Sequence, residues 1–170
     1  MSTIVAGGLV LTLMLAIVVF LTTTLLNASA LQAMALDDAW DSQEKRLREN
    51  ASISSTSSSD SGGGTNITVL IENTGEVAVS DFDGMDLLVQ YTTPPGTTVV
   101  VRLPYVATGP GNNEWTVASI SPDTFHPGIW DPGETAAVSL RLVPPSKAGT
   151  YGTVAVVLTK GASDSAYFNN

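Results

Sequence analysis

Residues 66–75 read NITVLIENTG, and this stretch decides the fold of the chain around it. Ile67, Val69 and Ile71 recur at every second position, with polar residues at positions 68 and 72. A period of two is typical of a strand with one buried face. The NTG sequence at 73–75 is a turn signal, because Asn and Gly tolerate backbone conformations that other residues avoid. The stretch therefore predicts a strand followed by a turn.

The same pattern recurs along the rest of the chain. Period-two apolar runs occupy 87–91, 99–101, 138–142 and 154–158, and weaker ones lie at 77–80 and 114–119. Turn signals separate them, at 83–84, 94–96, 109–111, 131–133 and 144–145. No helical pattern lies between the runs, so we expect an antiparallel β-sandwich of about seven strands with an immunoglobulin-like topology. The pattern alone leaves the strand order open.

The N-terminal segment has a different character. Residues 1–36 contain no charged side chain and are rich in Leu, Val, Ile, Ala and Met. As one helix they would be roughly 54 Å long, whereas about 20 apolar residues already cross a hydrocarbon layer of about 30 Å. Leu31, Met34 and Leu36 carry apolar surface beyond such a span. We therefore expect something other than lipid to bury part of it.

The helical pattern is expected to continue to residue 50. Leu36, Trp40 and Leu47 recur at helical spacing, and two oppositely charged i,i+4 pairs lie between residues 41 and 48, which favours an amphipathic helix. Residues 51–65 are dominated by Ser and Gly and predict a flexible linker. The expected fold is therefore α+β: a long hydrophobic helix at 1–50, a linker at 51–65 and an immunoglobulin-like head at 66–170.

Composition excludes several classes of function. All 7 Lys and Arg and all 16 Asp and Glu follow Leu36, and the formal charge of −9 disfavours nucleic acid as a partner. The chain has no Cys, which excludes disulfides and thiolate metal sites. Its one histidine, His126, has no adjacent nucleophile, and no phosphate-binding glycine loop precedes a helix. We expect no enzyme activity and no cofactor.

The sequence contains two kinds of candidate site, a metal site and glycosylation sites. Asp81, Asp83 and Asp86 imitate the start of a calcium loop, although Thr92 stands where the closing Glu would be required. Two interpretations stay open, a plain hairpin turn and a bound divalent cation. Asn50 and Asn66 begin N-x-[ST] sequons near the Ser-rich stretch and are candidate glycosylation sites.

The combination resembles a known family. A long apolar N-terminal helix before an immunoglobulin-like domain is similar to the archaellins, the type IV pilin-like subunits of the archaeal swimming filament. Short head motifs resemble that pattern as well: NTGE at 73–76, DFDGMD at 81–86 followed by LLVQY, and WDPGE at 130–134. Typical bacterial type IV pilins have an acidic residue at mature position five, where this chain has Val5. Val5 therefore favours an archaellin-like or archaeal pilin-like subunit over an ordinary bacterial type IV pilin.

The resemblance implies an exported structural subunit. A prepilin-type peptidase would remove a short basic leader before Met1, and the subunit would wait in the cytoplasmic membrane before export and assembly machinery adds it to a cell-surface filament. Its partners would be copies of itself in a helical homopolymer for swimming. The positions expected to form the helix contacts are Ile4, Leu9, Leu11, Leu15, Val18, Phe20, Leu25, Leu31, Leu36, Trp40 and Leu47.

Two alternatives remain open at this point. One is an adhesive pilus subunit whose head binds a surface ligand. The other is a membrane-anchored, stator-like accessory protein of the same machine, whose β domain grips the cell envelope.

Overall fold

A computed structural model describes Met14 and residues 20–24, 27–28, 31–37, 39–40 and 48–170 of the chain. The chain divides into two compact units, residues 1–44 and residues 45–170.

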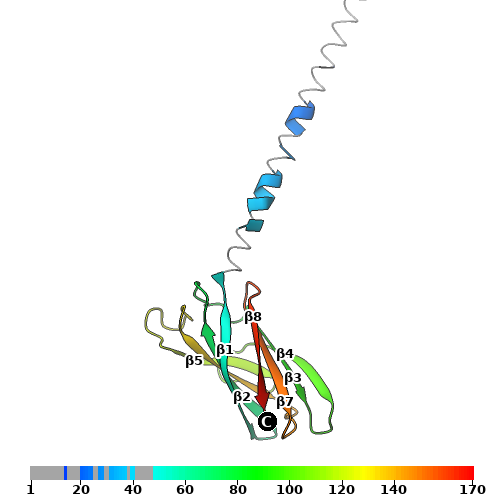
Figure 1. Cartoon of the computed structure of the whole chain (residues 1–170), viewed down its shortest axis with the longest axis vertical. Helices are drawn as coiled ribbons and strands as arrows, with labels where there is room; N and C mark the ends of the chain where they lie inside the picture. Colours follow the sequence, from blue (N-terminus) through cyan, green and yellow to red (C-terminus); the bar gives the residue numbers. More distant parts are fainter. Residues whose placement is uncertain (1–13, 15–19, 25–26, 29–30, 38, 41–47) are drawn as a thin grey trace, which may run out of the picture. The chain divides into compact units, whose positions relative to one another are not determined.

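The larger unit is a sandwich of two antiparallel sheets (Figure 1). Its strands are β1 (Ala51–Ser61), β2 (Gly64–Asn73), β3 (Asp86–Thr92), β4 (Thr98–Leu103), β5 (Glu114–Ser121), β6 (Thr135–Leu142), β7 (Tyr151–Val157) and β8 (Ser163–Asn169). One sheet has the order β1-β2-β6-β5 and the other β4-β3-β7-β8. This strand order is that of immunoglobulin-like sandwiches, which confirms the β-sandwich predicted for the head.

The core lies between the two sheets. Buried and partly exposed residues alternate along β2, β6 and β7, as the period-two runs predict. Val69, Val138 and Val154 are among the buried side chains of these strands, and Trp115 and Trp130 are the largest fully buried ones. Each such side chain contributes about 1.5–3 kcal/mol through removal from water. The sandwich is therefore held mainly by the inner faces of its strands.

The first strand lies where a flexible linker was predicted. Residues 51–61 form β1, which pairs with β2 along its length, from Ala51 opposite Asn73 to Ser61 opposite Gly64. Gly62 and Gly63 both have positive φ, 57° and 74°, as a two-residue type I′ hairpin requires. The linker prediction is therefore wrong for these residues, because the glycines make a tight turn and the serines line an edge strand.

The hydroxyls of β1 help to hold a Ser-rich strand that contributes only Ala51 and Ile53 to the apolar core. Thr56 Oγ1 donates to the carbonyl of Tyr167 in β8 at 2.8 Å, and Ser58 Oγ donates to the carbonyl of Asn169. The backbone N–H of Ile53 donates to the Asp164 carboxylate at 2.7 Å. β1 and β8 lie side by side (Figure 1), and we call this contact the β1–β8 seam. It joins the two sheets along one side.

The long N-terminal helix, and with it the α+β class, is the prediction that the structure overturns. The described residues before the head form only short helical stretches, chiefly 20–24 and 31–37 (Figure 1). Their apolar side chains are exposed, Phe20 by 68% and Trp40 by 69%. Most helical stability in proteins comes from packing an apolar face, and within one chain the described residues offer these side chains no such contact. In the residues that the structure describes, the fold is an all-β sandwich preceded by short helical stretches.

Two smaller differences concern the strands. Residues 77–80 were expected to form a strand, but only Val79 pairs there, as an isolated bridge to Trp130. β8 was not predicted, because Phe168 is the only fully buried side chain in it. None of the helical stretches that the structure describes combines the length and apolar character of a membrane-crossing helix.

Candidate functional site

The chain enters the head through a segment docked on its surface. The backbone N–H of Gly75 donates to the carbonyl of Asn50 at 3.0 Å, and that of Glu76 donates to the carbonyl of Arg48 at 2.7 Å. The Arg48 guanidinium lies 3.4 Å from the Glu76 carboxylate. Both side chains are at least half exposed, so this ion pair adds little. The two backbone bonds are the main attachment, and we call residues 48–50 with 75–76 the junction.

Gly75 is required for the junction to close. A Cβ at this position would lie 2.5 Å from the backbone N of Asn50 and 2.6 Å from the carbonyl O of Arg48. Backbone atoms cannot swing aside as the end of a long side chain can. A second attachment comes from Glu49, whose carboxylate accepts the backbone N–H of Lys160 at 2.9 Å. The head therefore holds the entering chain from two loops.

The side chain of Asn73 supports the junction through hydrogen bonds to the backbone next to it. Its amide nitrogen donates to the carbonyls of Val77 and Trp130 at 2.9 and 3.0 Å, and its Oδ1 accepts the N–H of Gly75 at 3.1 Å. The side chain is almost completely buried. The sequence identified this residue only as part of a turn signal. Its supporting role depends on Trp130, far along the chain, which the local motif could not reveal.

The WDPGE motif at 130–134 forms a buried polar turn. Trp130 Nε1 donates to the carbonyl of Glu134 at 2.8 Å, and Glu134 Oε2 accepts the backbone N–H of Asp131 at 3.0 Å. His126 Nδ1 lies 3.0 Å from Asp131 Oδ2, so the imidazole links the preceding loop to this turn. No nucleophile hydrogen-bonds to His126 among the described residues. These contacts stabilise the turn at 130–134 and the loop before it.

The acidic residues proposed as metal ligands do not converge. Asp81 Oδ1 accepts the backbone N–H of Gly84 at 3.1 Å, and Asp86 accepts Arg102 Nε at 2.6 Å. In the part of the chain that the structure describes, no three His, Asp or Glu side chains are grouped so that they could hold a metal ion. Both interpretations left open by the sequence, the hairpin turn and the bound divalent cation, remain predictions.

The candidate glycosylation sites lie in unlike surroundings. Asn50 is an exposed residue of the junction. Asn66 is half-buried in β2, and its Oδ1 lies 3.4 Å from Arg141 Nη1. The sequons remain predictions, and Asn50 is the more accessible of the two.

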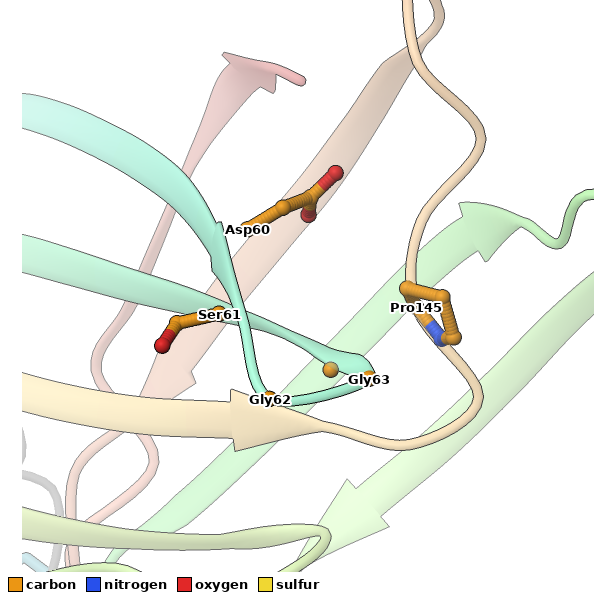
Figure 2. A pocket seen from close by; sticks show the side chains of 6 residues that line it. Asp60, Ser61, Gly62, Gly63 and Pro145 are labelled. Atoms are coloured by element: carbon orange, nitrogen blue, oxygen red, sulfur yellow. The ribbon is translucent and has the colours of Figure 1, made fainter.

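A shallow hollow of about 270 Å³ lies at the β1–β2 turn, lined by residues 60–64 and Pro145. The side chains of Asp60 and Ser61 point in different directions there (Figure 2). Asp60 already accepts hydrogen bonds from Thr65 and Asn170. The hollow is smaller than most ligand pockets and offers no converging polar groups.

Four of the apolar positions expected to mediate polymerisation can be placed. Phe20, Leu31, Leu36 and Trp40 are all exposed. The others, Ile4, Leu9, Leu11, Leu15, Val18, Leu25 and Leu47, lie outside the described residues. Exposed apolar surface of this kind marks a site that contacts protein or membrane.

Comparison with solved structures shows which proteins share this fold. A chain of the archaeal flagellum of Methanospirillum hungatei strain JF1 matches with a TM-score of 0.63 and 15% identity, over 97% of this chain and 92% of that chain. The archaellum periplasmic stator protein FlaG from Sulfolobus acidocaldarius matches with a TM-score of 0.49 and 19% identity, over 71% of this chain and 99% of that chain. The chain therefore has the fold of an archaeal flagellum protein.

Sequence comparison then gives the family. No family model matches the chain. An uncharacterised protein of Archaeoglobus fulgidus is 34% identical over 159 residues, which cover 91% of this chain and 89% of that protein. The chain belongs to the same family as this Archaeoglobus fulgidus protein.

Proposed function

We propose that the protein is a structural component of an archaellum-type machine at the cell surface, without catalytic activity. The observation that carries the proposal is the fold shared with the Methanospirillum hungatei flagellum chain over 97% of this chain, N-terminal segment included. The exposed apolar side chains of that segment, such as Phe20 and Trp40, need a membrane or a protein partner to cover them. The β-sandwich is then the part that stands outside the membrane.

Within this machine, we favour the role of a membrane-anchored, stator-like accessory protein. A stator has to hold its position against the torque of a rotating filament, so its anchor and its head must be firmly connected. The head meets this requirement on its own side as far back as residue 48, because Arg48, Glu49 and Asn50 are bonded to two of its loops. A flexible tether at 51–65 would have allowed the head to turn freely, whereas these residues form β1 and its hairpin instead.

A second candidate is a filament subunit. The chain that matches is named as part of an archaeal flagellum, and the match covers 97% of this chain. In a polymer, the exposed side chains of Phe20, Leu31 and Trp40 would be buried between copies, at about 25 cal/mol per Å² of apolar surface removed from water. A contact that does not close on itself produces an open helical assembly.

Gene deletion combined with fractionation tests both roles. Deletion is expected to abolish swimming. If the protein is a stator-like accessory, it stays in the membrane fraction at low copy number and filaments still assemble without it. If it is a filament subunit, it is abundant in sheared filaments, and these vanish on deletion. Normal swimming together with lost surface attachment would instead indicate an adhesive pilus subunit, and normal swimming with normal attachment would contradict the proposal.

A further inference from the structure

The edges of the two sheets are not equally protected. An edge strand exposes backbone N–H and C=O groups that can pair with another strand, and proteins usually block them. β1 and β8 are blocked by the β1–β8 seam, in which the side chains of Thr56 and Ser58 donate to β8 carbonyls. β5 is interrupted by a bulge between Val117 and Ser119. Each of these three edges thus carries a feature that prevents further pairing.

β4 carries no such feature. It lies at the outer edge of its sheet (Figure 1), and it pairs in register with β3 from Thr98 to Leu103 without a bulge. Among the described residues, its backbone makes no hydrogen bond beyond β3. The strand reads TVVVRL, and Val100 is 66% exposed. β-branched residues of this kind pair well across strands, so the free side of β4 suits another strand.

The stretch of chain around β4 carries few charges in a strongly acidic protein. Residues 87–113 contain a single charged side chain, Arg102, although the whole chain carries −9. Arg102 is already held by Asp86 of β3, through Nε at 2.6 Å. Two copies of an acidic protein repel one another over most of their surfaces. β4 is where they can approach without opposing like charges.

We propose that β4 pairs with β4 of a second copy, antiparallel and across a two-fold axis at Val100. In this register Val100 faces the partner's Val100, and Thr98 faces the partner's Arg102, so no like charges meet. The half-buried Val99 and Val101 would continue the core from one copy into the next. The two four-stranded sheets would become one eight-stranded sheet, with the same surface used by both copies.

The pairing is expected where copies are already close together. One six-residue edge buries less surface than a stable interface of about 1,200 Å² requires, so the isolated head in dilute solution is expected to dimerise weakly. An apolar N-terminal segment confined to a membrane or a polymer raises the effective concentration of the heads. The inference does not depend on whether the protein is an accessory or a filament subunit.

Cysteine cross-linking tests the pairing directly, because the natural chain has no Cys. A full-length Val100→Cys variant, oxidised in the cell fraction where the protein is recovered, is expected to form a disulfide-linked dimer. Residues opposite each other in an antiparallel pair have Cα atoms about 4.5–5.5 Å apart, which is within disulfide range. The matched control is Tyr167→Cys, which is 75% exposed on the outer face of β8. Val100→Cys is expected to cross-link roughly tenfold faster than this control.

The register gives a second test. Thr98→Cys and Arg102→Cys are each expected to cross-link poorly alone and well when the two variants are expressed together. Adding Val100→Lys to both should abolish that cross-link, because it places two like charges opposite each other. Three results would overturn the proposal: equal rates for Val100→Cys and Tyr167→Cys, a Val100→Cys adduct with a different protein, or a cross-link between Thr98→Cys and Arg102→Cys that survives Val100→Lys.

Discussion

Gly152 leaves space for the aromatic ring opposite it. It pairs with Phe168 across β7 and β8, and a Cβ at this position would lie 2.3 Å from Phe168 Cζ and 2.9 Å from the carbonyl O of Gln90. Because Phe168 is buried, its ring has little room to move. We expect Gly152→Ala to lower the free energy of unfolding by about 1–3 kcal/mol, measured by urea denaturation.

A double-mutant cycle tests whether the Phe168 ring is responsible. Phe168→Leu removes the two ring atoms nearest to the added methyl group. Gly152→Ala is therefore expected to cost clearly less in a Phe168→Leu background than in the parent chain, since contacting residues couple by about 0.5–3 kcal/mol. An equal cost in both backgrounds would mean that the clash lies with the backbone of Gln90.

Tyr91 makes the stability of the head sensitive to alkaline pH. Burial raises the pKa of its phenol above the usual 10.0, because the charged form loses hydration. The unfolded chain therefore releases this proton first as the pH rises. The stability from the protonated phenol is complete below pH 10 and is lost as the pH passes through the folded value. We expect Tyr91→Phe to lose less stability than the parent between pH 8 and pH 11, in urea midpoints, and the exposed Tyr151→Phe to behave like the parent.

At the scale of single elements, β1 gives the sharpest prediction. Thr56 and Ser58 hold β8 through hydroxyl groups, whereas Ser57 and Ser59 are exposed. Replacing Thr56 and Ser58 together with Ala is expected to cost about 2 kcal/mol, at about 1 kcal/mol for each hydrogen bond. The double Ser57→Ala and Ser59→Ala variant removes two hydroxyls from the same strand without touching the seam. If calorimetry gave equal melting temperatures for the two double variants, the seam would not contribute to stability.

The elements also show what the sequence could and could not predict. β2, β3, β6 and β7 bury one face in the core, so their apolar residues recur with a period that local sequence displays. β1 has no such period, because its hydroxyls bond to a strand 111 residues away. The long helix was inferred from the apolar composition of residues 1–36 and from the helical spacing and i,i+4 charge pairs that follow it. Composition shows that the apolar side chains need burial, but it does not show which surface buries them.

The candidate functional site was predicted less well than the fold, and for a related reason. The NTG motif at 73–75 was identified as a turn, but its role at the junction depends on Arg48 and Asn50, which lie before β1. The carboxylates of Asp81 and Asp86 are close in sequence, yet Arg102 holds Asp86 in the structure. Sites made from separate segments become visible only when the strand order is known.

At the scale of the whole molecule, the junction holds residues 48–50, immediately before β1, against two loops of the head. Gly75→Ala adds a methyl group about 2.5 Å from backbone atoms of that segment, and we expect it to release residues 48–50 from the head. The amides of Glu76 and Lys160 then lose their acceptors on Arg48 and Glu49. Their hydrogen exchange is expected to become roughly tenfold faster, while exchange in β6 stays unchanged.

Gly111→Ala provides the matched control for this change. The Cβ added there would meet only the end of the Glu114 side chain, at 2.6 Å, and that carboxylate can swing away. This variant should keep the slow exchange of Glu76 and Lys160. If the firm connection serves a stator-like role, Gly75→Ala cells should swim more slowly although the protein remains present at its normal level and its head remains folded. Normal swimming with a released junction would show that the connection has no part in motility, and unchanged exchange would show that Gly75 does not control it.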